Sequence, residues 1–299
     1  YGNVDVDMRY LVIQNGAMDS VNGQTSGAGI LNESSLDLLG VVIRNNQVTC
    51  SNGIDCINQV GGGIKNFGIL DLNNVTIQNN NAIRGGGLFN TGTNGVASIY
   101  NTTISGNLAQ QSGGGVVNYA TIGMVNSTIS GNIGLDGVGG IHNDGIFYLG
   151  NVTIADNGTE GTINFVNVET ALFRNTLITS TLGKTNCNLT HPITSDGYNL
   201  SSDNTCGFGA GTGDKINTNP RISLLGNWGG LYPAQVSLTH GLIAGSPVID
   251  AGNINGCKGF NNDNLLTYDQ RGQPRFPGRC DIGAFEGSLT QVFLPLVRR

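Results

Sequence analysis

Charged residues are scarce in this sequence of 299 residues, in which Asp, Glu, Lys and Arg together make up only 11%. The net charge is −6, and the arginines are scattered singly rather than gathered into a basic patch with aromatic residues between them. We therefore do not expect nucleic acid or an anionic membrane surface to be the main partner.

Proline and helix-forming patterns are also sparse. There are 7 prolines against 48 glycines, and no stretch repeats apolar residues at helical spacing. This composition suits short strands joined by tight corners rather than helices or a disordered tail. No transmembrane run, signal peptide or initiating Met is present, so we expect a mature or trimmed export product without membrane insertion.

A short phrase that begins with Asn recurs every 24 to 27 residues. Its clearest copies cover residues 74–77, 101–104, 126–129, 151–154 and 175–178, and an alternating apolar pair precedes each copy. Between copies lies a glycine run with a second apolar strand closed by Asn, as in Gly87-Leu88-Phe89-Asn90. Because so short a unit cannot bury its own apolar face, the period predicts a solenoid.

The pattern within each repeat indicates which solenoid. Three short strands per turn, with β-branched residues and with glycine at the corners, predict an all-β fold: a right-handed parallel β-helix with an irregular, disulfide-linked C-terminal cap. A leucine-rich repeat has a similar period, but its Leu-rich consensus is missing.

Two internal ladders follow from stacking, which places equivalent residues about 4.8 Å apart. One should contain the repeated isoleucines, Ile77, Ile104, Ile129, Ile154 and Ile178. The other should contain structural asparagines three residues later, Asn80, Asn107, Asn132 and Asn157. We expect these asparagines to adopt left-handed backbone angles at the turn and to bond to the amides above and below.

The six cysteines bracket interruptions of the repeat. We expect local disulfides that close loops outside the stacked core, although other pairings are possible. The expected pairs are Cys50 with Cys56, Cys187 with Cys206, and Cys257 with Cys280. Such bonds are typical of proteins outside the cytosol. A zinc site is the rival interpretation, but no Cys-x-x-Cys spacing supports it.

After about Leu182 the repeat loosens, and ordered motifs follow: SDGYNL (195–200), TH (239–240), GSPVIDAG (245–252), DQRG (269–272) and CDIGAFE (280–286). Over roughly residues 183–286 the chain resembles the choice-of-anchor Q domain, which is found at the C-terminal end of exported bacterial β-helix proteins. The preceding coils resemble pectate-lyase-type repeats. The resemblance implies an extracellular, cell-surface location and no settled activity. We therefore expect β-helix repeats over 1–182, a choice-of-anchor-Q-like module over 183–287 and a C-terminal tail over 288–299.

The charged residues of these motifs are predicted to be structural. We expect an ion network that holds irregular loops over the last coil. Its members would be Asp250, Asp269, Asp281 and Glu286 with Arg271 and Arg275. A catalytic or calcium cluster is the alternative, but glycine and proline punctuate the motifs, which favours the structural role.

The regular coils offer no clear active site. Their acids, such as Asp71, look isolated, and no two are expected to share a column. His142 and Asp144 are the most catalytic-looking neighbours, yet His142 occupies a variable, outward-facing position. We therefore expect no catalytic residue, cofactor or metal site, and interpret His191 and His240 as structural. Calcium could bind at the oxygen-rich loop 261–264, although this loop lacks a known calcium-loop spacing.

These observations favour a non-catalytic extracellular structural protein. The ends of a β-solenoid are unpaired strand edges, so copies of the chain could stack head to tail into a fibre or sheath. The apolar tail 292–297 could add a strand to the neighbouring copy or fold back on its own coils. One alternative is a surface adhesin or glycan-binding protein that uses Tyr100, Tyr119 and Tyr148, although aromatic residues make up only 6%. Another is a polysaccharide lyase or hydrolase, which the missing acid columns disfavour.

Overall fold

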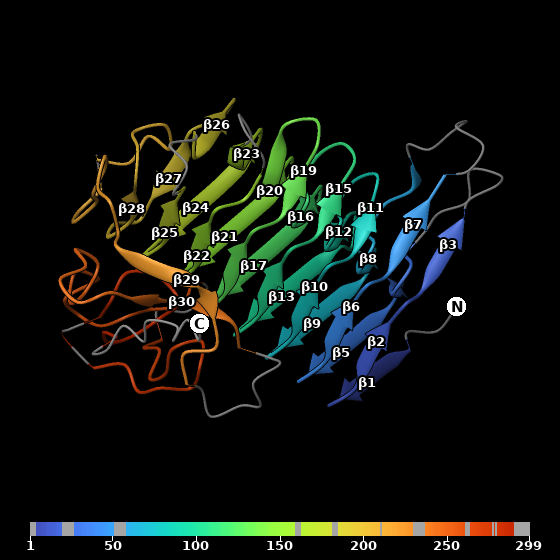
Figure 1. The fold of residues 1–299 in the computed structure, drawn as a ribbon, viewed down its shortest axis with the longest axis horizontal. Coiled ribbons are helices and arrows are strands. Elements are labelled where there is room, and N and C mark those ends of the chain that lie inside the picture. The colour runs from blue at the N-terminus through green and yellow to red at the C-terminus, as the bar shows by residue number, and fades with distance from the viewer. Residues whose placement is uncertain are drawn as a thin grey trace, which may run out of the picture.

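The computed structural model describes residues 4–19, 27–50, 58–158, 163–180, 185–209, 211–229, 237–260, 264–276, 278 and 280–289. Within these ranges the chain forms short β-strands and no α-helix. The strands stack as successive coils of a parallel β-solenoid (Figure 1), which confirms the predicted fold class. No helix long and apolar enough to cross a membrane occurs in the described ranges.

A complete coil contributes one strand to each of four parallel sheets, named A to D here in the order in which the chain visits them. The sequence predicted three strands per turn, and this count was wrong. The additional sheet C consists of strands of two or three residues, such as β11 (Asn81–Ala82). Strands this short show no period-two alternation, so the sequence pattern did not reveal them.

The strand bounds show how regular the stack is. Sheet A contains β1 (Asp5–Arg9), β5 (Ser35–Leu39), β9 (Ile69–Asn73), β13 (Val96–Tyr100), β17 (Thr121–Val125), β21 (Ile146–Gly150), β24 (Thr170–Arg174) and β27 (Ile193–Ser195). Sheet B contains β2 (Val12–Gln14), β6 (Val42–Arg44), β10 (Thr76–Gln78), β14 (Thr103–Ser105), β18 (Thr128–Ser130), β22 (Thr153–Ala155), β25 (Leu177–Thr179) and β28 (Leu200–Ser201).

The remaining strands complete the coils. Sheet C contains β3 (Ala17–Asp19), β7 (Gln47–Thr49), β11, β15 (Leu108–Ala109) and β19 (Ile133–Gly134). Sheet D contains β4 (Ile30–Asn32), β8 (Ile64–Asn66), β12 (Leu88–Asn90), β16 (Val116–Asn118), β20 (Val138–Asn143), β23 (Ile163–Asn167) and β26 (Cys187–Leu189). A separate antiparallel pair is formed by β29 (Ile222–Gly226) and β30 (Thr239–Leu242).

The interior is one continuous apolar core that runs along the stack. The predicted isoleucine ladder is confirmed, because Ile77, Ile104, Ile129, Ile154 and Ile178 lie in register on neighbouring strands of sheet B and are fully buried. Each such side chain stabilises the fold by about 1.5–3 kcal/mol relative to an exposed one. Towards the C-terminal end Phe165 makes edge-to-face contacts with Phe147 and Phe173.

The corners use left-handed residues, but at positions other than those predicted. Positive φ angles occur one residue before the ladder asparagines, at Asn79, Gly106, Gly131 and Asp156, and also at the first residue of each phrase, Asn74, Asn101, Asn126, Asn151 and Asn175. The turn is therefore complete before the ladder Asn, whose side chain then lies along the stacking direction. The glycine runs are explained by close packing between neighbouring coils. A Cβ on Gly86, for example, would lie 2.4 Å from the carbonyl oxygen of Leu108.

The C-terminal end of the core is covered by the segment that follows the last coil. Strands β26, β27 and β28 extend sheets D, A and B beyond residue 183, so the sheets do not end at the predicted module boundary. Phe208 belongs to the apolar core and lies 5.9 Å from Phe173 between ring centroids. The Cys187–Cys206 disulfide fixes this covering segment to β26.

The rest of the C-terminal region lies along the side of the stack (Figure 1). We call the described residues between 237 and 289 the lateral module. Its Gln270 Oε1 accepts a hydrogen bond from Thr128 Oγ1 at 2.6 Å, and the Ala284 N–H donates to Thr153 Oγ1 at 3.0 Å. The predicted position of the ion network over the last coil was therefore wrong, because outward threonines of sheet B supply polar partners along the flank instead.

Candidate functional site

Two ladders of buried asparagine side chains run along the stack. In the first, Nδ2 of Asn80, Asn107 and Asn132 donates to Oδ1 of the equivalent Asn one coil later, at 3.0, 2.9 and 2.8 Å. Each acceptor oxygen also takes the backbone N–H of the preceding ladder residue. The ladder continues from Asn157 through Asn164 to Asn186. A second ladder runs through Asn66, Asn90, Asn118 and Asn143 in sheet D. Because their amides bond to each other and to the backbone, these residues hold coils together rather than bind a ligand.

The lateral module contains two buried ion pairs. Arg271 Nη2 lies 2.6 Å from Asp269 Oδ2, and Arg275 Nη1 lies 2.8 Å from Glu286 Oε2. The Arg271 guanidinium also lies over the Phe285 ring, 3.4 Å from its centroid. Arg275 reaches beyond the module, because its Nη2 donates to Asn126 Oδ1 at the corner between sheets A and B, at 2.9 Å. This arginine therefore ties the module to the coils.

Asp281 belongs to the same region, and backbone groups bind its carboxylate. Its two carboxylate oxygens accept the backbone N–H groups of Asp250 and Gly287, both at 2.6 Å. Asp250 therefore contributes its backbone N–H to these contacts, and its backbone φ is 51°. Burial, together with the nearby Glu286 carboxylate, raises the pKa of Asp281 to about 7. Burial also raises the pKa of Glu286, against the lowering effect of Arg275.

A cavity of about 570 Å³ adjoins these two carboxyl groups, lined also by Ile249, Phe276 and Ser288. A carboxyl group that titrates near neutrality suits general acid catalysis. Here, however, the oxygens of Asp281 accept backbone N–H groups, and Glu286 Oε2 accepts both Arg275 and the Asp281 N–H. The hydrogen bonds of Asp281 and Glu286 therefore stabilise contacts between loops of the lateral module.

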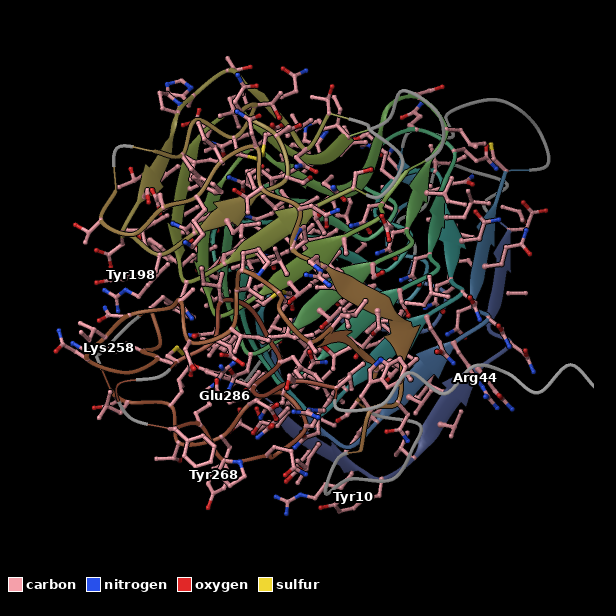
Figure 2. The ribbon with its side chains drawn as sticks, turned by 60° about the vertical axis from the view of Figure 1, so that its left-hand side comes forward. Tyr10, Arg44, Tyr198, Lys258, Tyr268 and Glu286 are labelled. Atoms are coloured by element: carbon pink, nitrogen blue, oxygen red, sulfur yellow. A yellow bond between two sulfur atoms is a disulfide. The ribbon has the colours of Figure 1, made fainter. Side chains whose placement is uncertain are left out.

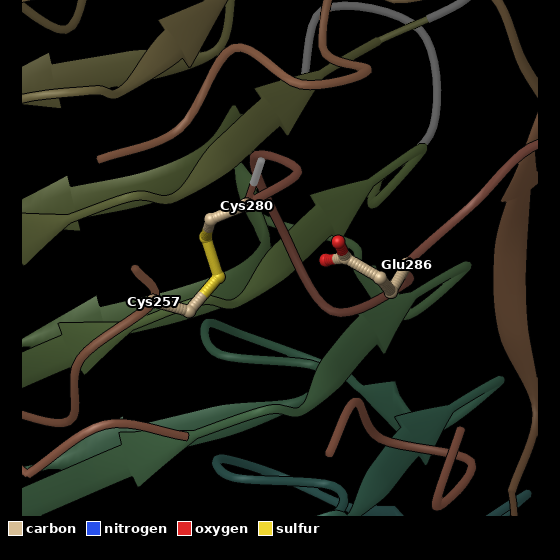
Figure 3. Close-up of side chains that lie close together, drawn as sticks. All are labelled: Cys257, Cys280 and Glu286. Atoms are coloured by element: carbon tan, nitrogen blue, oxygen red, sulfur yellow. A yellow bond between two sulfur atoms is a disulfide. The ribbon is translucent and has the colours of Figure 1, made fainter. Parts of the chain in front are cut away.

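In the described ranges Cys257, Cys280 and Glu286 form a group of potential metal ligands (Figure 3), with ligand atoms within 4.8 Å of one another. The two sulfur atoms are joined in a disulfide, as predicted. A metal would require thiolates, which the closed bridge does not provide. The predicted Cys187–Cys206 bond is also present. Cys50 is disulfide-bonded, whereas its predicted partner Cys56 lies outside the described residues.

His142 has two polar neighbours, of which the sequence indicated only one. Its Nε2 lies 3.1 Å from Asp144 Oδ1 and its Nδ1 lies 2.7 Å from Ser112 Oγ, which comes from the preceding coil. The order of groups is that of a serine nucleophile with its base, but the two ring nitrogens are exchanged, since in that arrangement Nε2 faces the serine. An oxyanion would need free N–H donors beside the serine. The N–H groups of Gly113 and Gly114 instead donate to the Val138 carbonyl, at 2.8 and 3.2 Å.

The other histidines have different surroundings. His191 is exposed, whereas His240 is buried, with Nε2 2.9 Å from Ser130 Oγ and Nδ1 2.8 Å from the Ser223 carbonyl. Burial lowers the pKa of His240, so the neutral ring donates from Nδ1 to the carbonyl and accepts the serine hydroxyl proton at Nε2. His240 therefore joins the module to sheet B. Of the oxygen-rich loop 261–264, only Asn264 lies within the described residues.

The three tyrosines considered for glycan binding do not form one platform. Tyr148 is stacked on Phe260 of the lateral module, with ring centroids 5.8 Å apart. Tyr119 packs against Phe89 on another part of the coil. Tyr100 lines a cavity together with Tyr268, which is exposed on the module (Figure 2).

An acidic column on the outer face of sheet A contradicts the expectation that acids stand alone. Asp37 pairs in register with Asp7 on one side and with Asp71 on the other, and all three are exposed. Partial desolvation and the neighbouring Asp71 carboxylate raise the pKa of Asp37. The column was missed because its members are 30 and 34 residues apart, outside the regular period of the later coils. The apolar residues that flank each aspartate in sequence were the available signal.

Removing one charge from this column should stabilise the coils. We expect Asp37→Asn to raise the free energy of unfolding by about 0.5 kcal/mol at low salt, because like charges on neighbouring strands repel. The gain should shrink in about 1 M salt, where screening is strong. Denaturant unfolding in both salts measures it, with Asp136→Asn, another exposed acid, as the control. Equal effects of the two substitutions would contradict the repulsion.

Among the described residues, inward side chains of the first coil are partly exposed at the N-terminal end of the stack. Strand β1 pairs only with β5 among the described strands, and β2, β3 and β4 likewise form the edges of their sheets. Val6 is 38% and Met18 39% exposed, whereas their partners one coil later, Leu36 and Val48, are 4% and 0% exposed. Tyr10 of the first coil is 72% exposed (Figure 2). We call the outer edge of β1 to β4 the open edge.

Comparisons with known proteins give no relative for this chain. No protein-family model, no curated protein and no solved structure matches it.

Proposed function

We propose that this chain is a non-catalytic structural protein of the cell exterior that self-associates through the open edge of its first coil. The observation that carries the proposal is the contrast between Val6 and Met18 at the open edge and their buried counterparts one coil later. Unpaired strand edges with apolar side chains beside them are favourable surfaces for adding further strands.

The opposite end of the stack argues against simple head-to-tail stacking. Phe208 and the Cys187–Cys206 disulfide occupy the place where another coil would continue the core. A head-to-tail fibre would need this covering segment to move. The tail 292–297, which the sequence suggested as a link between copies, lies outside the described residues.

An extracellular location is supported by the chemistry of the cysteines. Two disulfides lie in the described C-terminal region, and such bonds persist mainly in oxidising compartments. The resemblance of the C-terminal motifs to the choice-of-anchor Q domain points to the same location and to a bacterial cell surface.

Self-association is tested by sedimentation velocity of the purified chain over a range of concentrations. We expect the wild type to form an oligomer, and Met18→Lys to sediment as a monomer, because a charge at the open edge cannot be buried cheaply. Leu224→Lys is the matched control, since Leu224 is 82% exposed in β29, away from the open edge. A wild type that remains monomeric throughout would refute the proposal.

Hydrolysis is the alternative that has a specific observation behind it, the Ser112–His142–Asp144 series. The occupied N–H groups of Gly113 and Gly114 argue against it. A fluorophosphonate probe distinguishes the two functions, since covalent labelling that is lost in Ser112→Ala would favour an enzyme. Glycan binding has less support, because Tyr119 packs against Phe89 away from the other two, and Phe260 is stacked on Tyr148.

A further inference from the structure

We infer that the partner at the open edge is a second copy of this chain, paired through β1 in antiparallel orientation about a two-fold axis. The inference rests on the proposed self-association and adds its orientation and register. A two-fold contact uses the same surface on both copies, so it requires β1 to be complementary to itself.

The sequence of β1 meets this requirement when the axis passes beside Asp7. In that register all five residues from Asp5 to Arg9 have a partner: Asp7 faces Asp7 of the second copy, and Val6 faces Met8 of the second copy. Val6 and Met8 are the inward side chains, as their pairing with Leu36 and Leu38 shows. The apolar interiors of the two copies would thereby become continuous.

Charges on the outer face add two favourable pairs in the same register. Asp5 and Arg9 point to the same side as Asp7, and the axis places each Asp5 opposite the other copy's Arg9. Opposite charges directly across an antiparallel pair are favourable. Arg9 already contacts Asp7 of its own chain, with Nε 2.9 Å from Oδ1. In the dimer Arg9 would lie between Asp7 of its own chain and Asp5 of the second copy, and its charge would offset the repulsion between the facing Asp7 side chains.

Other antiparallel registers fit less well. A shift of one residue would place Val6 opposite Asp7 and reverse the inward and outward faces. A shift of two residues in one direction would place Asp5 opposite Asp7, which is a like-charge pair. A shift of two in the other direction keeps favourable charges but pairs only three residues of β1. The register centred on Asp7 therefore has the largest overlap, with the facing Asp7 side chains as its one like-charge pair.

A two-fold contact of this kind closes on itself and gives a dimer rather than a fibre. This agrees with the C-terminal end of the stack, where Phe208 covers the core and leaves no second open end of the same kind. The dimer would present two covered C-terminal ends, each with its lateral module, facing away from the shared centre.

Crosslinking tests the orientation. With Asp7→Cys, mild oxidation should join two chains, because facing residues of an antiparallel pair have Cβ atoms about 4.5–5.5 Å apart, close to what a disulfide needs. Asp5→Cys is the matched control and should crosslink far less, since it faces Arg9. Efficient crosslinking of Asp5→Cys, or none of Asp7→Cys in a chain that still dimerises, would overturn the inference.

A charge exchange tests the register independently. Asp5→Arg and Arg9→Asp should each weaken dimerisation by about tenfold, because the axis repeats every lost pair. The double variant Asp5→Arg/Arg9→Asp should restore most of the affinity. Additive losses in the double variant would contradict the register. A monomeric wild type would instead refute the proposed function itself, so the two failures remain distinguishable.

Discussion

The Asn107→Ala variant should unfold with a free energy about 3–5 kcal/mol below that of the wild type, because several buried polar groups lose their partners together. Asn107 Oδ1 accepts both the N–H and the Nδ2 of Asn80, and its own Nδ2 donates to the Ile77 carbonyl and to Asn132 Oδ1. All these groups are buried, so water cannot replace the missing amide without opening the stack.

Chemical unfolding followed by circular dichroism measures this loss. Asn94→Ala is the matched control, because Asn94 is exposed on the same coil and its removal should cost at most about 0.5 kcal/mol. If the two variants unfold within about 1 kcal/mol of each other, the ladder does not hold the coils as we argue. A lower cooperativity in Asn107→Ala alone would indicate that the stack separates at this coil.

The features predictable from the sequence are those that the repeat copies at a constant spacing. The isoleucine ladder was predicted because Ile77, Ile104 and Ile129 occupy the same position in successive phrases. When the coils stack in parallel register, residues at equivalent positions come into contact. The disulfides Cys187–Cys206 and Cys257–Cys280 were predictable because each closes a local loop.

Features that depend on irregular spacing or distant contacts were not predictable in the same way. Asp7, Asp37 and Asp71 share a column because they occupy equivalent positions on paired strands, but their spacings of 30 and 34 residues depart from the period of the later coils. The lateral module docks through pairs such as Thr128 with Gln270, which are 142 residues apart and follow no periodic pattern. Its place on the flank, rather than over the last coil, therefore required the three-dimensional structure.

The stability of the lateral module should fall as the pH rises from about 4 to about 7. The folded state raises the pKa of Asp281 from 3.8 to about 7, chiefly by burial and then by the charge of Glu286. Below the unfolded pKa the carboxyl is protonated in both states, so folding carries no penalty. Between the two values only the unfolded state ionises freely, and above about 7 the full penalty, about 4 kcal/mol, opposes folding.

Asp281→Asn isolates this effect, because a carboxamide does not ionise. Its oxygen can still accept the Asp250 N–H, while the bond from Gly287 is lost. Near pH 4 the variant should therefore be less stable than the wild type by about 1–2 kcal/mol, and near pH 8 it should be the more stable of the two.

This crossing of the two stability profiles distinguishes an ionising carboxyl from a merely well-packed one. His240 changes stability in the opposite direction, since its lowered pKa removes stability as the pH falls below about 6.5. That contribution is common to both proteins, so it cancels in the difference between them at each pH. Denaturant unfolding at about pH 4, 6 and 8 measures the difference, and a constant offset would show that Asp281 stays ionised in the fold, held by its two N–H donors.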